Sequence, residues 1–250
     1  MNFDLTPMWI SLKTAGTATC ITFFLGIALA RWLAFYQGRA KGLIDGLLIM
    51  PMVLPPTVVG FMLLLIFGRN GFMGQLLLKM GTTVIFSWTA TVITATVVAL
   101  PLMYKTVRGA FEQIDVNILD AARTLGASEW KIFWQVTVPL SLPGILAGTI
   151  LSFARALGEF GATLMLAGNI PGKTQTIPVA IYFAAEGGQK EKALIWVLII
   201  IVISLCMVLT LNYLGKNRRN NPNLLSWGVK NATISQYYEK VSGLYPRGKF

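Results

Sequence analysis

The sequence contains no histidine and few charged side chains, which limits the chemistry that the chain can perform. Lys, Arg, Asp and Glu make up 12% of the 250 residues, whereas 55% are hydrophobic. A soluble domain carries about 25% charged residues, so the predicted solvent for much of this chain is a lipid bilayer. Without histidine there is no Ser-His or Cys-His catalytic pair, and the commonest metal ligand is missing. A membrane-embedded enzyme is therefore disfavoured.

Cysteine is also scarce. Cys20 and Cys206 both lie inside apolar runs, and we expect them to be small packing residues rather than a disulfide. The formal net charge is +11, but the basic residues are spread between apolar runs and form neither a stripe nor a recognition motif. Nucleic acid is therefore not expected as a partner. The basic residues instead indicate membrane topology.

Long apolar runs are abundant. A spanning helix needs about 20 mostly apolar residues, and five segments qualify: 9–34, 43–67, 83–104, 138–167 and 193–214. Residues 176–185 are apolar but too few to span, so they are predicted to form a re-entrant or interfacial helix. We expect an all-α polytopic membrane protein, with a transmembrane domain over 1–215 and a cytoplasmic tail over 216–250.

The distribution of Lys and Arg predicts the orientation. If the N-terminus is outside, the inner loops hold ten of these residues and the outer loops five. The positive-inside rule then places the N-terminus outside and the C-terminus in the cytoplasm. The long polar stretch 105–137 is predicted to be cytoplasmic.

A helix–glycine–helix unit is predicted within this polar stretch. Asp115 is expected to cap a first helix, and Gly126 to end it. Ser128 is expected to cap a second helix, with Glu129 in its first turn. Connections between helices usually take 2 to 8 residues. The unit is longer than a plain connector requires, so we favour a docking surface for a cytoplasmic partner.

The first helix of this unit is amphipathic. Asp120 and Arg123 are predicted to point away from its apolar face. That face should hold the residues at i, i+3, i+4 and i+7, namely Ile118, Ala121, Ala122 and Leu125.

The unit resembles the cytoplasmic signature of membrane subunits of ABC-type importers. The signature is Glu-Ala-Ala, three residues, Gly, nine residues, then aliphatic, any residue, aliphatic and Pro. The matching residues here are Asp120, Ala121, Ala122, Gly126, Val136, Val138 and Pro139. The resemblance implies a type I ABC importer permease fold. It also implies a coupling helix, with Glu129 and Pro139 in the same unit, that sits in a groove of an ATPase subunit. Asp120 replaces the family's Glu, so an ion pair made by that Glu does not carry over directly.

Two spans carry candidate residues for a translocation path. Arg155 and Glu159 are spaced i, i+4 and should face the same way on one helix. They form either a mutual ion pair that locks the helix or a source of positive potential for an anion path. The prolines of the second span favour either a gating element or a static kink. The candidate path residues are Pro55, Pro56, Thr57, Arg155, Glu159 and Thr163.

The stretch "AGNIPGKT", residues 167–174, matches a loose form of the phosphate-binding loop. Such a loop works between a strand and a helix, whereas this one follows a predicted span on the outer face. We interpret it as a coincidence for nucleotide binding, although a turn with Lys173 and Thr174 could meet an anion at the outer mouth.

Over residues 8 to 215, the chain resembles the permease subunit of molybdate ABC transporters. The segments "LPPTVVGFMLLLIFGRNG" and "RALGEFGATLMLAGNIPGKTQTIP" carry this resemblance. Sulfate and thiosulfate permeases share the Gly-Glu-aromatic-Gly core, whereas the Ala162-Thr163 step and "GKTQTIP" favour molybdate. Tungstate has nearly the same size and charge as molybdate, so it stays an alternative.

The resemblance implies a set of partners in a bacterial plasma or inner membrane. These are a second copy of the chain, two ATPase subunits that use ATP and Mg, an extracytoplasmic molybdate-binding protein and membrane lipid. No catalytic residue, metal or cofactor is expected in this chain. A rival from another class is an ion-gradient-driven anion transporter or a channel, which needs no docking unit. Glu159 is the only acid deep within a predicted span, and Asp45 lies near a membrane boundary.

Overall fold

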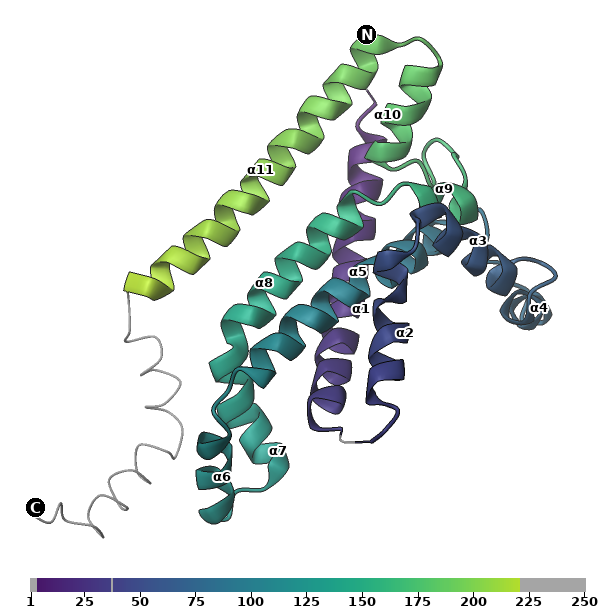
Figure 1. The fold of residues 1–250 in the computed structure, drawn as a ribbon. Coiled ribbons are helices and arrows are strands. Elements are labelled where there is room, and N and C mark those ends of the chain that lie inside the picture. The colour runs from purple at the N-terminus through teal and green to yellow at the C-terminus, as the bar shows by residue number, and fades with distance from the viewer. Residues whose placement is uncertain (1–3, 37, 221–250) are drawn as a thin grey trace, which may run out of the picture.

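The computed structural model describes residues 4–36 and 38–220, and every regular element in those residues is a helix (Figure 1). The predicted all-α fold class is confirmed. In chain order, the elements are α1 (Thr6–Phe35), α2 (Lys41–Val53), α3 (Pro56–Phe67), α4 (Phe72–Lys79), α5 (Trp88–Glu112), α6 (Val116–Thr124), α7 (Glu129–Ile132), the π-helical segment η1 (Phe133–Thr137), α8 (Val138–Leu157), α9 (Gly161–Ala167), α10 (Ile177–Glu186) and α11 (Lys190–Asn220). Most of the predicted tail 216–250 lies outside the described residues, which end within it at residue 220.

Four helical runs of the described chain are long and apolar enough to cross a membrane. They are Thr6–Phe35, Trp88–Glu112, Glu129–Leu157 and Lys190–Thr210, and α2 with α3 makes a fifth if this bent pair is counted as one span. The predicted short helix at 176–185 is α10, ten residues long. The expectation of about five transmembrane helices is therefore met.

The core is built around α5, which packs against α1 and α8. In the most apolar window of α5, 67% of the residues are buried. Gly26 of α1 permits this close packing, because a Cβ there would lie 2.5 Å from Cγ of Met103. The hydroxyls of Thr14 and Thr91 join α1 to α5 at 3.0 Å. Ser152 of α8 donates a weaker hydrogen bond of 3.4 Å to a carbonyl of α5.

The predicted second span, 43–67, is bent at its prolines, as expected, and the bend is sharp enough to divide it into two helices. It is broken between α2 and α3, whose axes differ by 111°. Leu54 takes an extended backbone, with ψ at 146°, because a residue before proline is disfavoured in the α region. Pro55 has no N–H to continue the helical ladder, and Pro56 begins α3. By contrast, Pro51 lies within α2.

The predicted fourth span, 138–167, is wrong as one helix. The helix ends at Leu157 with Gly158 as its C-cap, and α9 begins at Gly161. At its other end, the run continues back through η1 and α7 to Glu129. The predicted third span is shifted as well, since α5 begins at Trp88 and extends into the polar stretch as far as Glu112.

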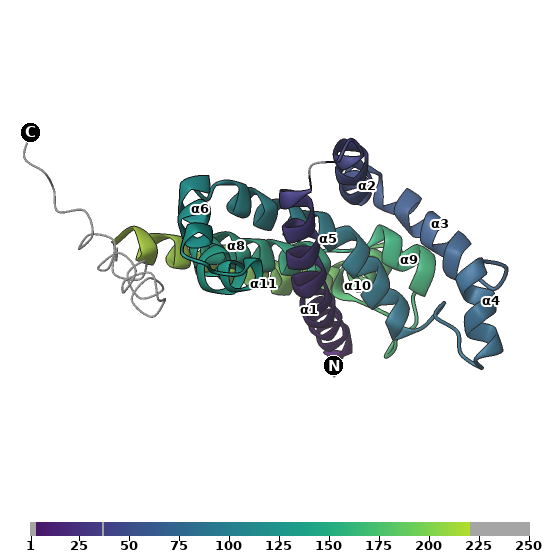
Figure 2. The ribbon, with the colours of Figure 1, turned by 90° about the horizontal axis from the view of Figure 1, so that it is seen from below.

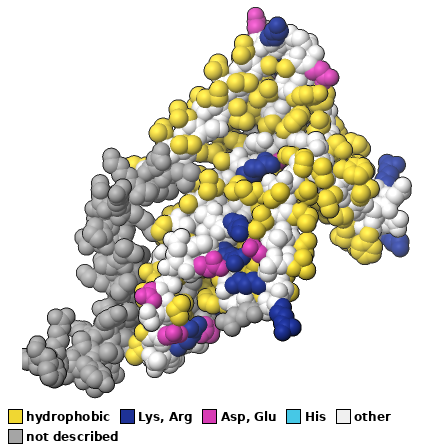
Figure 3. Space-filling view, in the orientation of Figure 1, with side chains coloured by type: hydrophobic (Ala, Val, Ile, Leu, Met, Phe, Trp, Pro, Cys, Tyr) yellow, Lys and Arg dark blue, Asp and Glu magenta, His cyan; other side chains and the backbone are white. Residues whose placement is uncertain are grey.

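The two ends of the molecule differ in character. The N-terminus and α10 lie at one end, and α6 and α7 lie at the opposite end (Figure 1). Charged side chains lie mainly near those two ends, with further basic side chains at the α4 edge and near the middle of a mostly hydrophobic surface (Figure 3). Helix α11 contacts α10 and α8. It slants across the molecule roughly alongside α8 in Figure 1, and the two helices overlap when the molecule is seen from below in Figure 2. In the apolar window of α11, only 11% of the residues are buried.

The two cysteines are both free, as expected, but they are exposed on the chain surface. The prediction that they are packing residues inside the chain is therefore wrong. An apolar run that faces lipid looks the same in sequence as one that faces protein, because both environments select hydrophobic side chains.

Candidate functional site

The helix–glycine–helix unit forms as predicted. Oδ1 of Asp115 accepts a hydrogen bond from the amide of Asn117 at 2.9 Å, which caps α6. Gly126 ends this helix with φ at +79°, in the left-handed region that favours glycine. Its amide donates to the carbonyl of Arg123, and the amide of Ala127 donates to that of Ala122. These two bonds define a Schellman closure.

The second helix, α7, starts at its predicted cap. The hydroxyl of Ser128 accepts a long hydrogen bond of 3.4 Å from the amide of Lys131. Glu129 is the first residue of the helix, where a negative charge is favourable. The same run then continues as η1 and α8, so the unit is joined without interruption to a membrane span.

Pro139 accounts for the π-helical segment that precedes α8. A proline inside a helix donates no hydrogen bond, and its ring clashes with the carbonyl four residues earlier. Here the amide of Val138 donates to the carbonyl of Phe133, five residues back, which widens the helix just before the proline. The Pro of the signature thus has a structural consequence, which is a fixed change of helical winding where the unit meets the span.

An ion-pair bridge holds the two helices of the unit together. Nε and Nη2 of Arg123 donate to the two carboxylate oxygens of Glu129 at 2.7 and 3.3 Å. Nη1 of Arg123 donates to Oδ1 of Asp120 at 2.6 Å. The hydrogen bonds from Glu129, and secondarily from Asp120, raise the pKa of Arg123. Exposed pairs contribute little stability individually, so the bridge chiefly fixes the angle between α6 and α7.

The buried face of α6 differs from the prediction. Leu119 and Ala122 are buried against Ile132 and Val136, whereas Ile118 is 41% exposed. The predicted face is therefore rotated by about one position, because α7 folds back against that side of α6. Ala121 and Asp120 are exposed beside Ile118, and together they make an outward-facing ridge.

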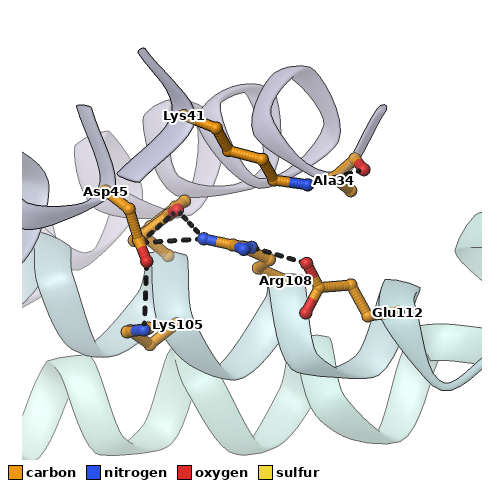
Figure 4. A network of polar contacts seen from close by, with 7 residues as sticks. Ala34, Lys41, Asp45, Lys105, Arg108 and Glu112 are labelled. Carbon is orange, nitrogen blue, oxygen red and sulfur yellow. Dashed lines mark hydrogen bonds and ion pairs between the residues drawn. The ribbon is translucent and has the colours of Figure 1, made fainter. Parts of the chain in front are cut away.

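A polar network that the sequence reading missed joins α2 to α5 near the same end of the molecule (Figure 4). Asp45 of α2 pairs with Arg108 at 2.8 Å and with Lys105 at 3.5 Å. The hydroxyl of Tyr104 donates to Asp45 and accepts from Arg108, each at 2.7 Å. Arg108 also pairs with Glu112. The i, i+4 spacing of Tyr104, Arg108 and Glu112 predicts that their side chains contact one another. No residue near them in sequence indicates that Asp45 of α2 is their partner.

Arg155 and Glu159 form the predicted ion pair, with Nη1 of Arg155 2.8 Å from Oε2 of Glu159. They do not lie on one helix, since α8 ends at Leu157. Instead, Oε1 of Glu159 accepts a hydrogen bond from the amide of Ala162 at the start of α9. The Glu159 side chain is 1% exposed and that of Arg155 30% exposed. The carboxylate is thus internal, while the Arg155 side chain is partly exposed at the surface of the chain.

Helix α9 packs against α3, just beyond the break in the second span. A Cβ on Gly161 would lie 3.1 Å from Cβ of Pro56, and one on Gly60 would lie 2.7 Å from Cα of Ala162. The two glycines therefore set the close approach of these helices. The path candidates Pro56 and Thr57 thus lie next to Gly161, which in sequence stands between the path candidates Glu159 and Thr163.

The remaining path candidates divide into buried and exposed sets. The hydroxyl of Thr163 lies 3.0 Å from that of Thr94 on α5, and both are buried. Pro55, Pro56 and Thr57 are exposed on the chain surface. Thr163 therefore joins α9 to the core, whereas the break at Pro55 lies on the exposed surface of the chain.

The "AGNIPGKT" stretch lies between α9 and α10, which is not the strand-to-helix setting of a phosphate-binding loop. Its threonine is turned inward: the hydroxyl of Thr174 accepts from the amide of Ile170 and donates to the carbonyl of Gly168. Among the described residues, no group of three His, Cys, Asp or Glu side chains could hold a metal ion.

The arrangement is that of a transporter membrane subunit, with apolar spans joined to a rigid polar unit that faces outward at one end. The architecture matches that of a bacterial ABC transporter involved in the import of alginate, with a TM-score of 0.70 over 87% of this chain and 80% of that one, at 16% identity. The fold is therefore that of a type I ABC transporter permease. A family model described as "Binding-protein-dependent transport system inner membrane component" matches residues 23–220, and the chain belongs to this family.

Several curated relatives are similar over most of their length. The molybdenum transport system permease protein ModB of Escherichia coli is 45% identical over 209 residues, or 81% of this chain and 90% of that protein. ModB of Haemophilus influenzae is 43% identical over 215 residues, or 85% and 94%. A more distant relative, "Probable sulfate transport system permease protein cysT" of Chlorokybus atmophyticus, is 34% identical over 82% of this chain and 72% of that protein. The chain is thus an inner-membrane permease subunit and is not itself catalytic.

Proposed function

We propose that this chain is the permease of a molybdate importer, and that two copies form the path while two ATPase subunits bind their α6–α7 units. The unit is the observation that carries this proposal. It exposes the signature residues Asp120, Ala121 and Gly126, whereas Ala122 and Val136 hold it together from inside, and it is closed by the turn at Gly126 and braced by Arg123. A binding protein on the opposite face would deliver the anion. The choice of molybdate rests on the ModB relatives and on the Ala162-Thr163 and "GKTQTIP" segments.

The proposed orientation places the α6–α7 unit in the cytoplasm and the N-terminus outside. Support comes from the excess of Lys and Arg in the inner loops and from the separation of the two ends in Figure 1. ATP and Mg would be used by the partner ATPase, and no cofactor or metal site is assigned to this chain.

In the proposed mechanism, the run from Glu129 to Leu157 works as a lever. Its 29 residues correspond to about 40 Å at 1.5 Å per residue. One end is braced to Arg123 in the ATPase-facing unit. The other end carries Arg155, whose ion-pair partner Glu159 follows two residues after Leu157. A displacement of the unit by ATP-driven closure would therefore move the pathway end of the same run.

The break at Pro55 divides the second span into two halves whose relative angle could change when the Glu129–Leu157 run moves. Helix α2 is tied to α5 through Asp45, whereas α3 is tied to α9 through Gly60. Both halves of the second span also pack on α5, but in different core clusters: α2 on its second half, and α3 on its first half together with α9. The exposed break lies between them. In the proposal, alternating access is a change of angle at Leu54 and Pro55.

Arg155 is the proposed anion contact within the path. A guanidinium has five N–H donors, and the bond to Glu159 uses one of them. The others can donate to oxyanion oxygens while the ion pair stays intact. The partly exposed position of Arg155 would place it between two copies of the chain, where a path shared by both would run.

Sulfate or thiosulfate is the second candidate substrate, because the cysT relative shares the fold family and 34% identity; tungstate is a close chemical analogue of molybdate. The test is uptake of radiolabelled molybdate into proteoliposomes that contain this chain, its ATPase and its binding protein, in competition with each oxyanion. Strong competition by tungstate and weak competition by sulfate is expected. Preferential uptake of sulfate would overturn the molybdate assignment and leave the ABC importer class intact.

A further inference from the structure

An apolar groove lies between the second half of α1 and the α7–η1–α8 run. Its volume is about 750 Å³, and we call it the α1 groove. The α1 wall carries Phe23, Ile27, Arg31 and Phe35 at four-residue spacing, and the facing wall carries Trp130, Phe133, Trp134, Val138, Leu142 and Ile145. It is therefore bounded on one side by a membrane span and on the other by the helical run that begins in the coupling unit.

The α1 groove extends from the depth of the spans to the level of the polar unit. From Phe23 to Tyr36, α1 advances about 20 Å, which is more than half of the roughly 30 Å hydrocarbon core. Trp130 and Trp134 stand at the polar end, 62% and 51% exposed. Tryptophan is enriched where a membrane protein meets the headgroup region. The shape and composition suit an acyl chain whose headgroup lies at the tryptophan end.

Arg31 brings to this end of the groove a positive charge that has no close ion pair. Its guanidinium carbon lies 4.0 Å from the ring centre of Phe133 and 5.0 Å from that of Trp130. Within the described residues, no carboxylate lies at ion-pair distance from Arg31, whereas Arg108, Arg123 and Arg155 each have one.

Among the described residues that line the groove, the one acid, Glu129, is near enough to attract Arg31 but makes its hydrogen bonds elsewhere. Both carboxylate oxygens of Glu129 accept hydrogen bonds from Arg123. Arg123 is thus occupied by two carboxylates, those of Glu129 and Asp120, so among the described lining residues Arg31 is the arginine that has no close ion pair. An arginine held on aromatic faces, with free donors at the membrane boundary, is suited to a phosphate oxygen.

We propose that the α1 groove binds an anionic phospholipid of the cytoplasmic leaflet, with the phosphate on Arg31 and an acyl chain between α1 and α8. The leaflet follows from the proposed orientation, on which this inference rests. The bound lipid fills the space between a membrane span and the helical run of the coupling unit. The headgroup contact makes the site selective for negative charge, because a zwitterionic lipid brings no net charge to Arg31.

The test is native mass spectrometry of the full-length chain in complex with its ATPase, titrated with phosphatidylglycerol or with phosphatidylcholine of the same acyl chains. The wild type is expected to prefer phosphatidylglycerol by about fivefold, the effect of one arginine near an anionic surface. Arg31→Gln should abolish this preference, and Arg31→Lys should retain most of it. Arg39→Gln is the matched control, because Arg39 is exposed and does not line the groove.

A second variant tests the acyl-chain part independently of charge. Ala28 lines the groove on α1, so Ala28→Trp should fill the space and lower the binding of both lipids. A photoactivatable phosphatidylglycerol should label peptides from 23–36 or 130–145 in the wild type. Absence of headgroup preference in the wild type, or an unchanged preference in Arg31→Gln, would overturn the proposal. So would an increase in lipid binding after deletion of 221–250, since that segment would then be the occupant.

Lipid binding is read without transport, so the two proposals fail separately. A chain that prefers phosphatidylglycerol but takes up no molybdate would refute only the assigned transport activity. A chain that imports molybdate but shows no lipid preference would refute only the α1 groove as a lipid site.

Discussion

Replacement of Gly126 by aspartate tests whether the α6–α7 unit can still fold while it loses its proposed function in binding the ATPase. Gly126 holds a left-handed backbone at φ +79°, and a Cβ there would meet no atom of this chain within 4 Å. The cost to the chain itself is therefore conformational. It amounts to about 1 kcal/mol for an ordinary L-residue, and less for Asn or Asp, whose side chains tolerate this conformation. A penalty of 1 kcal/mol lowers the closed-to-open ratio of the unit by about fivefold.

Gly126→Asp is expected to insert normally, to keep its unfolding temperature within a few degrees, and yet to lose ATP-dependent uptake and ATPase binding. The added carboxylate lies at the turn between Asp120 and Glu129 and competes for Arg123, which braces the two helices. Gly126→Asn is the matched control, because it has nearly the same shape and backbone tolerance without the charge. Gly126→Ala should fall between the two. Normal uptake by Gly126→Asp would refute the coupling role of the unit.

Three further substitutions test the path and its supports. Arg155→Gln should lower uptake at least tenfold while the complex still assembles, with partial recovery in Arg155→Lys; unchanged uptake in Arg155→Gln would make this arginine a bystander. Gly60→Ala should destabilise the chain by about 1–3 kcal/mol, measured by thermal unfolding in detergent, because its Cβ would lie 2.7 Å from Cα of Ala162. Gly16→Ala should be neutral or slightly stabilising, since a Cβ there meets nothing within 4 Å; equal effects of both would contradict the packing argument. Asp45→Asn should cost about 1–3 kcal/mol by removing the ionic tie between α2 and α5, and an unfolding temperature equal to that of wild type would show that the tie contributes nothing.

Local signals predicted the fold of the α6–α7 unit well. The caps at Asp115 and Ser128 and the turn at Gly126 depend on residues within a few positions of each other, so a sequence contains the information that decides them. The buried face of α6 was predicted one position away from its true place. Helical periodicity alone gave Ile118, whereas the contact with α7 buries Leu119.

The breaks in two spans were less readable. The prolines at 55 and 56 were visible, but the 111° bend also depends on α3 packing against α9, a contact made by residues about 100 positions apart. The end of α8 at Leu157 was hidden inside a continuous apolar run. Hydropathy measures whether a segment prefers lipid or a core, not whether it is one helix.

Long-range partners could not be predicted at all. Asp45 was noted only as an acid near a membrane boundary, and its pairing with Arg108 spans more than 60 positions of sequence. The Arg155–Glu159 pair was predicted from its spacing. That prediction was correct about the contact and wrong about the shared helix, because side chains of this length can still meet across the C-cap at Gly158.

The most direct test of the central claim is the energy source of uptake. Proteoliposomes that contain this chain, its ATPase and its binding protein would be supplied either with ATP at the ATPase face or with a proton or sodium gradient alone. The account predicts molybdate accumulation only with ATP, and none when Gly126→Asp replaces the wild type. Accumulation driven by an ion gradient without ATP would contradict it and would identify a secondary transporter.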